Sequence, residues 1–194
     1  PVDVYVPGCA ARPESIIAGV LQAAAVLEKK RALMRAAHGE VDALAIERAV
    51  AADAPEILAL QKIVYQNEAE MYDDASLTPL RQTLAEMRAD FAHRVFLKAV
   101  VGGTIVGSVR GRLEGDTAAV GWLIVHPYFW NRGIGLKLLA AIEEHFPSAR
   151  RFETFMGEKA RYTMAPFQSM GYTPFRQVRV TEHRERVYFE KARS

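Results

Sequence analysis

The residues best suited to chemistry form one stretch, Trp122 to Leu139, in which a strand, a loop and the start of a helix follow one another. Gly133 and Gly135 stand where this helix begins. Glycine lacks a Cβ atom, so a ligand can approach the backbone there, and the unpaired N–H groups at the positive end of a helix favour a phosphate. The stretch is therefore predicted to bind an anion. A tight strand-to-helix turn without a ligand is the alternative explanation of the two glycines.

Two nucleotide-binding motifs do not fit this stretch. A Rossmann fingerprint needs a third glycine where this chain has Leu138, and its strand belongs to a parallel sheet, whereas the preceding strand here is predicted to be part of an antiparallel meander. A P-loop needs a lysine directly after a glycine and then Ser or Thr, and Lys137 meets neither condition. The expected ligand group is thus a diphosphate bound outside a mononucleotide fold.

The elements around this stretch are predicted from periodicity and turn signals, and they describe a mixed α/β domain. Asp53 is the expected N-cap of the first helix, and the acidic segment 68–76 is expected to separate that helix from the second. The predicted order begins with a strand at 44–49, helices at 53–66 and 77–92, and three antiparallel strands at 95–100, 104–113 and 118–125. It continues with a helix at 134–145, a strand at 152–156, a helix at 160–170 and two strands at 175–180 and 187–190.

Composition and charge exclude several classes of protein. The length of 194 residues indicates one domain, or one domain plus an appendage. With 50% hydrophobic and 25% charged residues the composition is typical of a soluble globular protein, and the formal charge of +2 gives no indication of nucleic-acid binding. The single cysteine, Cys9, excludes an internal disulfide and a zinc site of several cysteines, so no metal is expected. The apolar run 16–27 is too short to span a membrane and follows no basic leader, so a cytoplasmic location is expected.

The strand, loop and helix start resemble the acetyl-CoA signature of the GNAT family of N-acetyltransferases. That signature, Gln/Arg-x-x-Gly-x-Gly/Ala after a strand ending in a Val-x-Pro-like turn, is similar to Val125-His126-Pro127 and to the segment 131–135. Trp130 stands where Gln or Arg is usual, which matters little if backbone amides bind the phosphates. A second block, 152–159 followed by 167–172, resembles the next strand and helix of the family.

The resemblance covers about residues 43–192 and implies a GNAT fold, an α/β (α+β) arrangement in which two parallel strands of a mixed central sheet splay apart between flanking helices. Here these strands would be 118–125 and 152–156. Acetyl-CoA is the cofactor implied, with its pantetheine arm between the strands, where preorganised amides would stabilise the oxyanion. The residues implied for the pantetheine and thioester are Leu123, Ile124 and Val125, and those for the diphosphate are Asn131, Arg132, Gly133, Ile134, Gly135, Leu136 and Lys137.

The resemblance also implies direct attack by an amine, which must first lose a proton because a free alkyl amine has a pKa near about 10. Glu68, Glu70 and Asp73 are the candidates for the general base, since the corresponding stretch of the family borders the acceptor pocket. A solvated acidic loop without a catalytic role is the alternative.

The position of the family's usual tyrosine acid, which protonates the leaving thiolate, falls at Phe167 in this chain. The asparagine that often precedes that tyrosine by four positions falls at Thr163, which the resemblance therefore implies as an acetyl-CoA contact. Phenylalanine has no proton to donate, so water or Tyr162 would have to replace the acid. Because the usual acid is absent, slow acetyl transfer and binding of acetyl-CoA without catalysis both stay open as alternatives.

Residues 1–30 resemble a different protein, the end of the small iron–sulfur subunit of NADH:quinone oxidoreductases and hydrogenases. Cys9 matches a ligand of its four-iron cluster, but such a cluster needs four thiolates and this chain has one cysteine. We therefore expect residues 1–40 to form an appendage with a helix from about Glu14 to Ala37, and 41–194 to form the acetyltransferase domain. The apolar helix must bury against this domain, a second copy in a homodimer, or a partner protein.

The sequence as a whole predicts a cytoplasmic, acetyl-CoA-dependent N-acetyltransferase that acts on a primary amine. A small-molecule acceptor is expected rather than a protein lysine, because a compact catalytic domain without a recognition module leaves little surface for a peptide. Two alternatives stay open: a non-catalytic acyl-CoA-binding or sensing protein, favoured by Phe167, and an accessory subunit docked on a redox complex, favoured by residues 1–30.

Overall fold

The structure is a computed structural model of the chain, and it describes residues 17, 18, 20–24, 27, 28, 31, 34, 44–72, 77–158, 161–181 and 184–193. The chain divides into two units, Pro1–Ala43 and Leu44–Ser194. The described residues of the first unit are helical and include the exposed apolar side chains of Ile17, Val20, Leu21 and Leu27. Cys9, on which the iron–sulfur resemblance depends, lies outside the described residues. No helix in the described part of the chain is long and apolar enough to cross a bilayer.

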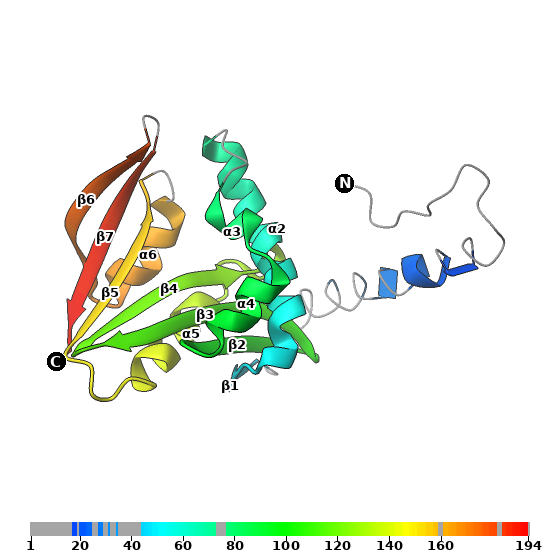
Figure 1. Cartoon of the computed structure of the whole chain (residues 1–194), viewed down its shortest axis with the longest axis horizontal. Helices are drawn as coiled ribbons and strands as arrows, with labels where there is room; N and C mark the ends of the chain where they lie inside the picture. The colour runs from blue at the N-terminus through cyan, green and yellow to red at the C-terminus, as the bar shows by residue number, and fades with distance from the viewer. Residues whose placement is uncertain are drawn as a thin grey trace. The chain divides into compact units, whose positions relative to one another are not determined.

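The second unit contains a seven-stranded sheet in the order β1-β2-β3-β4-β5-β7-β6 (Figure 1). All neighbouring strands are antiparallel except β4 and β5, which are parallel, so the predicted mixed sheet is confirmed. The strands are β1 (Ala45–Arg48), β2 (Val95–Val101), β3 (Thr104–Glu114), β4 (Thr117–Val125), β5 (Arg151–Gly157), β6 (Thr173–Thr181) and β7 (Arg184–Ala192). The helices are η2 (Ala51–Asp53), α2 (Ala54–Tyr72), α3 (Thr78–Arg81), α4 (Leu84–Asp90), η3 (Pro127–Phe129), α5 (Ile134–Glu144) and α6 (Arg161–Ser169).

Helices cover both faces of this sheet, and alternate residues of β3 show which helix covers which face. A Cβ atom on Gly107 would lie 3.0 Å from Leu138 of α5, whereas Arg110 donates a hydrogen bond to Gln61 of α2. Because successive side chains of a strand point to opposite faces, α2 and α5 pack on opposite sides. The buried residues of α5 are Ile134, Leu138, Leu139 and Ile142, and those of the α2 side include Ile57, Leu60, Met87 and Phe96.

Close packing between β3 and α5 predicts a stability effect at Gly111. A Cβ atom there would lie 2.8 Å from Phe146 Cε2 and 3.4 Å from Ile142 Cγ1. We expect Gly111→Ala to lower the free energy of unfolding in urea by about 1–3 kcal/mol, because the core must shift to admit the methyl group. Gly121→Ala is the matched control, since a Cβ atom at this strand position would meet nothing within 4 Å. Equal stability of the two variants would contradict this packing.

Two predicted helix boundaries differ from the structure. Helix α2 continues to Tyr72, so Glu68 and Glu70 lie within a helix and not in a loop. The helix predicted over 77–92 is divided into α3 and α4. Thr83 begins α4 with a capping box: its hydroxyl accepts a hydrogen bond from Glu86 N (3.2 Å), and the Glu86 carboxylate accepts one from Thr83 N (2.7 Å).

Candidate active site

A wedge between β4 and β5 forms the centre of the candidate site. The two parallel strands pair at only three positions, Thr117–Arg151, Ala118–Phe152 and Ala119–Glu153, and β5 then continues its pairing with β7 alone. From Val120 onward, the edge of β4 that faces β5 therefore has no strand partner. Figure 1 shows the two strands diverging from their common start. The predicted splay of these strands is confirmed.

A β-bulge in β4 lies at the wedge. Ser108 pairs with Ile124 and Arg110 with Gly121, so β4 carries one more residue than β3 across this interval. Trp122, within the bulge, has a φ of +56°, a left-handed conformation that bulky residues rarely adopt. A bulge leaves one residue out of the ladder and redirects the neighbouring side chains, which is a common arrangement beside active sites.

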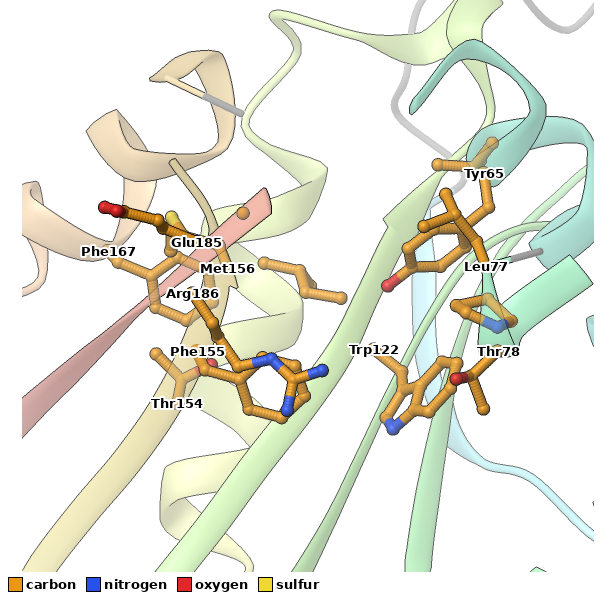
Figure 2. A pocket seen from close by; sticks show the side chains of 14 residues that line it. Tyr65, Leu77, Thr78, Trp122, Thr154, Phe155, Met156, Phe167, Glu185 and Arg186 are labelled. Carbon is orange, nitrogen blue, oxygen red and sulfur yellow. The ribbon is translucent and has the colours of Figure 1, made fainter. Parts of the chain in front are cut away.

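A cavity of about 340 Å³ occupies the wedge (Figure 2). One wall comes from β5, α6 and β7, and the opposite wall comes from α2, residues 77–79 and the bulge of β4. The six lining residues that matter for the following argument are Tyr65, Trp122, Leu123, Phe155, Phe167 and Arg186. In the described part of the chain, no group of His, Cys, Asp or Glu side chains could hold a metal ion.

The cavity reaches both faces of the sheet, because the two bulge residues point to opposite sides. Leu123 lies toward α5, where a Cβ atom on Gly135 would be 3.8 Å from its Cδ2. Trp122 lies toward α2: its ring is 5.9 Å from that of Tyr65 and 3.8 Å from the guanidinium carbon of Arg110. A ligand entering from the α5 side could thus meet one entering from the α2 side inside the wedge.

The N-terminus of α5 lies next to the end of β4. Gly133 is its N-cap, with a φ of +74° and no capping side chain, and the first hydrogen bond of the helix runs from Lys137 N to Gly133 O (3.1 Å). By helix geometry the N–H groups of Ile134, Gly135 and Leu136 have no acceptor within the helix. The structure therefore brings the predicted diphosphate segment beside the predicted pantetheine strand.

The model of the acetyltransferase (GNAT) family matches residues 56–171, more than half of the chain. The chain belongs to the GNAT family. This finding agrees with the mixed sheet, the splayed parallel strands and the uncapped helix start described above.

Solved GNAT structures share this fold. A GNAT acetyltransferase from Streptococcus pneumoniae superposes with a TM-score of 0.63 at 19% identity, over 77% of this chain and 98% of that one. The YncA protein of Salmonella typhimurium, solved with its cofactor acetyl-CoA, gives 0.61 at 18% identity over 78% and 94%. The PaiA N-acetyltransferase of Thermoplasma acidophilum in complex with coenzyme A gives 0.57 at 13% identity over 77% and 99%. A comparison with curated proteins gives no match.

Trp130, which departs from the GNAT signature, has a structural role in the turn after β4. Its indole Nε1 donates a hydrogen bond to Val125 O (2.7 Å), although 47% of the residue is exposed. His126 is buried in the same turn, and its Nδ1 accepts a hydrogen bond from Tyr128 N (3.3 Å). Burial lowers the pKa of His126, so the imidazole is neutral at pH 7 and can keep this bond. Both side chains hold the loop that leads to Gly133.

Phe167 lies where the GNAT resemblance places the usual acid. The residue is 4% exposed and lines the cavity, and its ring packs edge-to-face on that of Tyr172, with the ring centroids 5.3 Å apart. The neighbouring Tyr172 hydroxyl does not easily lose its proton, because burial and the nearby Glu143 carboxylate raise its pKa. Thr163 lies in α6, and its side chain is outside the described part of the structure.

The described part of the structure does not show the three predicted general bases at the cavity. Glu70 is exposed on α2 and is not among the described residues that line the cavity. Glu68 lies on the same helix with its side chain outside the described part, and Asp73 lies outside the described residues. All three stay predictions. Two cavity residues, Tyr65 and Arg186, lie outside every predicted site segment. Trp122 and Phe155 lie within the predicted stretches 122–139 and 152–159, but the sequence predicts no binding role for them.

Proposed function

We propose that this GNAT protein is a cytoplasmic N-acetyltransferase that transfers the acetyl group of acetyl-CoA to a primary amine of a small molecule. The observation that carries the proposal is the wedge between β4 and β5, which holds a cavity and leads directly to the uncapped start of α5. A wedge of this kind gives an extended thioester arm an unpaired strand edge to bind.

The residues present fit acetyl-CoA, which would supply the acetyl group as an activated thioester. The amides of 123–125 would hold the pantetheine arm, and the donors of 131–137 would hold the diphosphate. The backbone at Gly133 supports this fit, because a Cβ atom there would meet nothing within 4 Å and its surroundings are therefore open. His126 N donates to Val106 O on the β3 side, so by strand alternation the N–H of Val125 points toward the wedge.

The proposed reaction is direct transfer. The amine nitrogen attacks the thioester carbonyl carbon, the new C–N bond forms, and the C–S bond breaks. One proton leaves the amine and one is taken up by the departing sulfur. Backbone N–H groups at the β4 bulge are suited to stabilise the charge that develops on the carbonyl oxygen, because they are fixed before the reaction begins. Glu68, Glu70 and Asp73 stay the candidates for accepting the amine proton.

Replacing Phe167 with tyrosine is expected to raise the turnover rate. Phe167→Tyr would place a phenol hydroxyl on the cavity wall, where it could protonate the departing sulfur, and we expect kcat to rise by about tenfold or more. The measurement is steady-state release of free coenzyme A thiol with a saturating amine. Phe167→Leu, which also lacks a proton, serves as the control and should show no rise. An unchanged or lower kcat in a folded Phe167→Tyr protein would show that the missing acid does not limit turnover.

The proposal is tested by incubating the purified chain with acetyl-CoA and a panel of primary amines. We expect free thiol and N-acetylated product to appear in equal amounts, identified by mass spectrometry. Binding of acetyl-CoA without transfer to any amine would instead support the second candidate, a non-catalytic acyl-CoA-binding protein, which Phe167 favours because it removes the usual acid.

A further inference from the structure

The charge inside the cavity is unevenly distributed. Of the described residues that line it, only Glu185 and Arg186 are charged. Glu185 is already compensated by the β6–β7 hairpin: its Oε1 lies 3.2 Å from Arg179 Nη2, and its Oε2 accepts a hydrogen bond from Gln177 Nε2. The cavity is therefore expected to have a net positive potential that originates at Arg186.

The Arg186 guanidinium is held by a ring and not by a carboxylate. Its central carbon lies 4.2 Å from the ring centroid of Phe155, and it forms no ion pair with a carboxylate of the described residues. Figure 2 shows the group projecting from the β7 side into the space in front of Trp122. The planar face is thus occupied by Phe155, while the N–H edge stays available to a ligand in the cavity.

Strand register places this guanidinium on the side away from α5. Gly111, which packs on α5, lies opposite Val120 of β4, so Val120 and Ala118 point to the α5 face. Ala118 pairs with Phe152 of β5, which therefore points the same way. Phe155 lies three residues after Phe152 on β5. Because side chains alternate between the two faces of a strand, Phe155 points to the α2 face, and it is 41% exposed.

Arg186 shares that face, because it pairs with Gly157, two residues beyond Phe155. The proposed diphosphate site is at the α5 start on the opposite face. The charge of Arg186 is accordingly on the side where an acceptor would enter, near Tyr65 and Trp122, and it is not directed at the phosphates of acetyl-CoA.

We propose that Arg186 binds a carboxylate of the acceptor, so that the acceptor is an amine that also carries a carboxylate and an apolar or aromatic body, as an α-amino acid does. A guanidinium binds a carboxylate through two parallel hydrogen bonds, which fixes orientation as well as charge. A simple alkyl amine would place its own positive charge beside Arg186 without compensation. The rings of Tyr65, Trp122 and Phe155 would contact the apolar body. This inference rests on the proposed acetyl transfer.

The test uses pairs of amines that differ only by the carboxylate: phenylalanine with phenethylamine, tryptophan with tryptamine, and leucine with isoamylamine. We expect kcat/KM of the wild-type chain to be about tenfold or more higher for the amino acid of at least one pair. Arg186→Gln should remove that preference: kcat/KM should fall for the amino acid and rise for the carboxylate-free amine, because the like charge beside that amine is lost. Arg176→Gln is the matched control, because Arg176 also covers a ring, that of Tyr188 at 4.0 Å, but does not line the cavity.

Two results would overturn the inference: no pair in which kcat/KM is higher for the amino acid, or an equal loss of kcat/KM for both members of the pairs in Arg186→Gln. Calorimetric titration of the three amino acids into the chain with coenzyme A separates this inference from the proposed function. Amino-acid binding that Arg186→Gln abolishes, without any acetyl transfer, would support the carboxylate site and reject the transferase. Transfer to carboxylate-free amines, with no binding of any amino acid, would support the transferase and reject the carboxylate site.

Discussion

Replacing Asp90 with alanine should lower the free energy of unfolding by about 3–5 kcal/mol, and replacing Arg110 with methionine should cost less. Arg110 is 2% exposed in the core between β3 and α2, and its Nη1 donates to Asp90 Oδ2 (2.9 Å). Burial lowers the pKa of this guanidinium to about 10, and Asp90 opposes that shift. Asp90→Ala therefore leaves a buried charge without its counter-ion, although Gln61 and Gln82 still accept hydrogen bonds from Nη2.

The reverse deletion is milder, because the side chain of Asp90 is 31% exposed and can be hydrated once Arg110 is absent. Methionine also keeps most of the side-chain volume. Urea unfolding of both variants measures the difference. Glu47→Ala is the control: its carboxylate, 52% exposed and 3.8 Å from Lys98, should contribute less than about 1 kcal/mol. A larger loss for Arg110→Met than for Asp90→Ala would contradict the asymmetry.

Gly135→Asp should weaken acetyl-CoA binding by about 100-fold or more while leaving the fold intact. A carboxylate at the second residue of α5 would lie where the diphosphate is proposed to bind, and like charges a few ångströms apart repel strongly outside bulk water. Steric strain does not explain such a loss, because a Cβ atom on Gly135 comes no closer than 3.8 Å to Leu123 Cδ2 and 4.0 Å to Val125 Cγ2. An aspartate in the first turn is also stabilised by the positive end of a helix, so the variant should fold.

Calorimetric titration with acetyl-CoA measures this effect, and urea unfolding confirms that the variant folds. Gly115→Asp introduces the same charge in the β3–β4 turn, which precedes β4, whereas the start of α5 follows the other end of that strand. Its affinity should equal that of the wild-type chain. Undiminished binding by Gly135→Asp would place the diphosphate elsewhere.

Much of the fold around the site was predictable because local signals agree with the tertiary structure. Gly102-Gly103 and Gly115-Asp116 lie between the strands predicted at 95–100, 104–113 and 118–125, and all three glycines have positive φ in the turns that separate β2, β3 and β4. The start of a helix near Gly133 was also predictable, because the glycines and the apolar helix after them are local features, whereas the binding of a diphosphate by 131–137 stays a prediction. The left-handed Gly133 at the start of α5 agrees with the predicted helix start.

Other features depend on contacts that the sequence does not express locally. The local sequence does not predict the left-handed backbone conformation of Trp122. Its bulge depends on the register between β3 and β4 and on Arg110, which packs against the Trp122 ring. Helix α2 continues past Gln66 because residues 67–72 include no helix breaker, so the acidic pattern alone suggested a loop incorrectly. Arg186 could be placed in the cavity only once the β5–β7 pairing and the splay were known.

A crystal structure of the chain with coenzyme A tests the central claim most directly. The account predicts the pantetheine arm between β4 and β5, hydrogen-bonded to the unpaired edge of β4, with the diphosphate on the amides of Ile134, Gly135 and Leu136. Coenzyme A bound outside the wedge, or a wedge that stays empty at saturating coenzyme A, would contradict it.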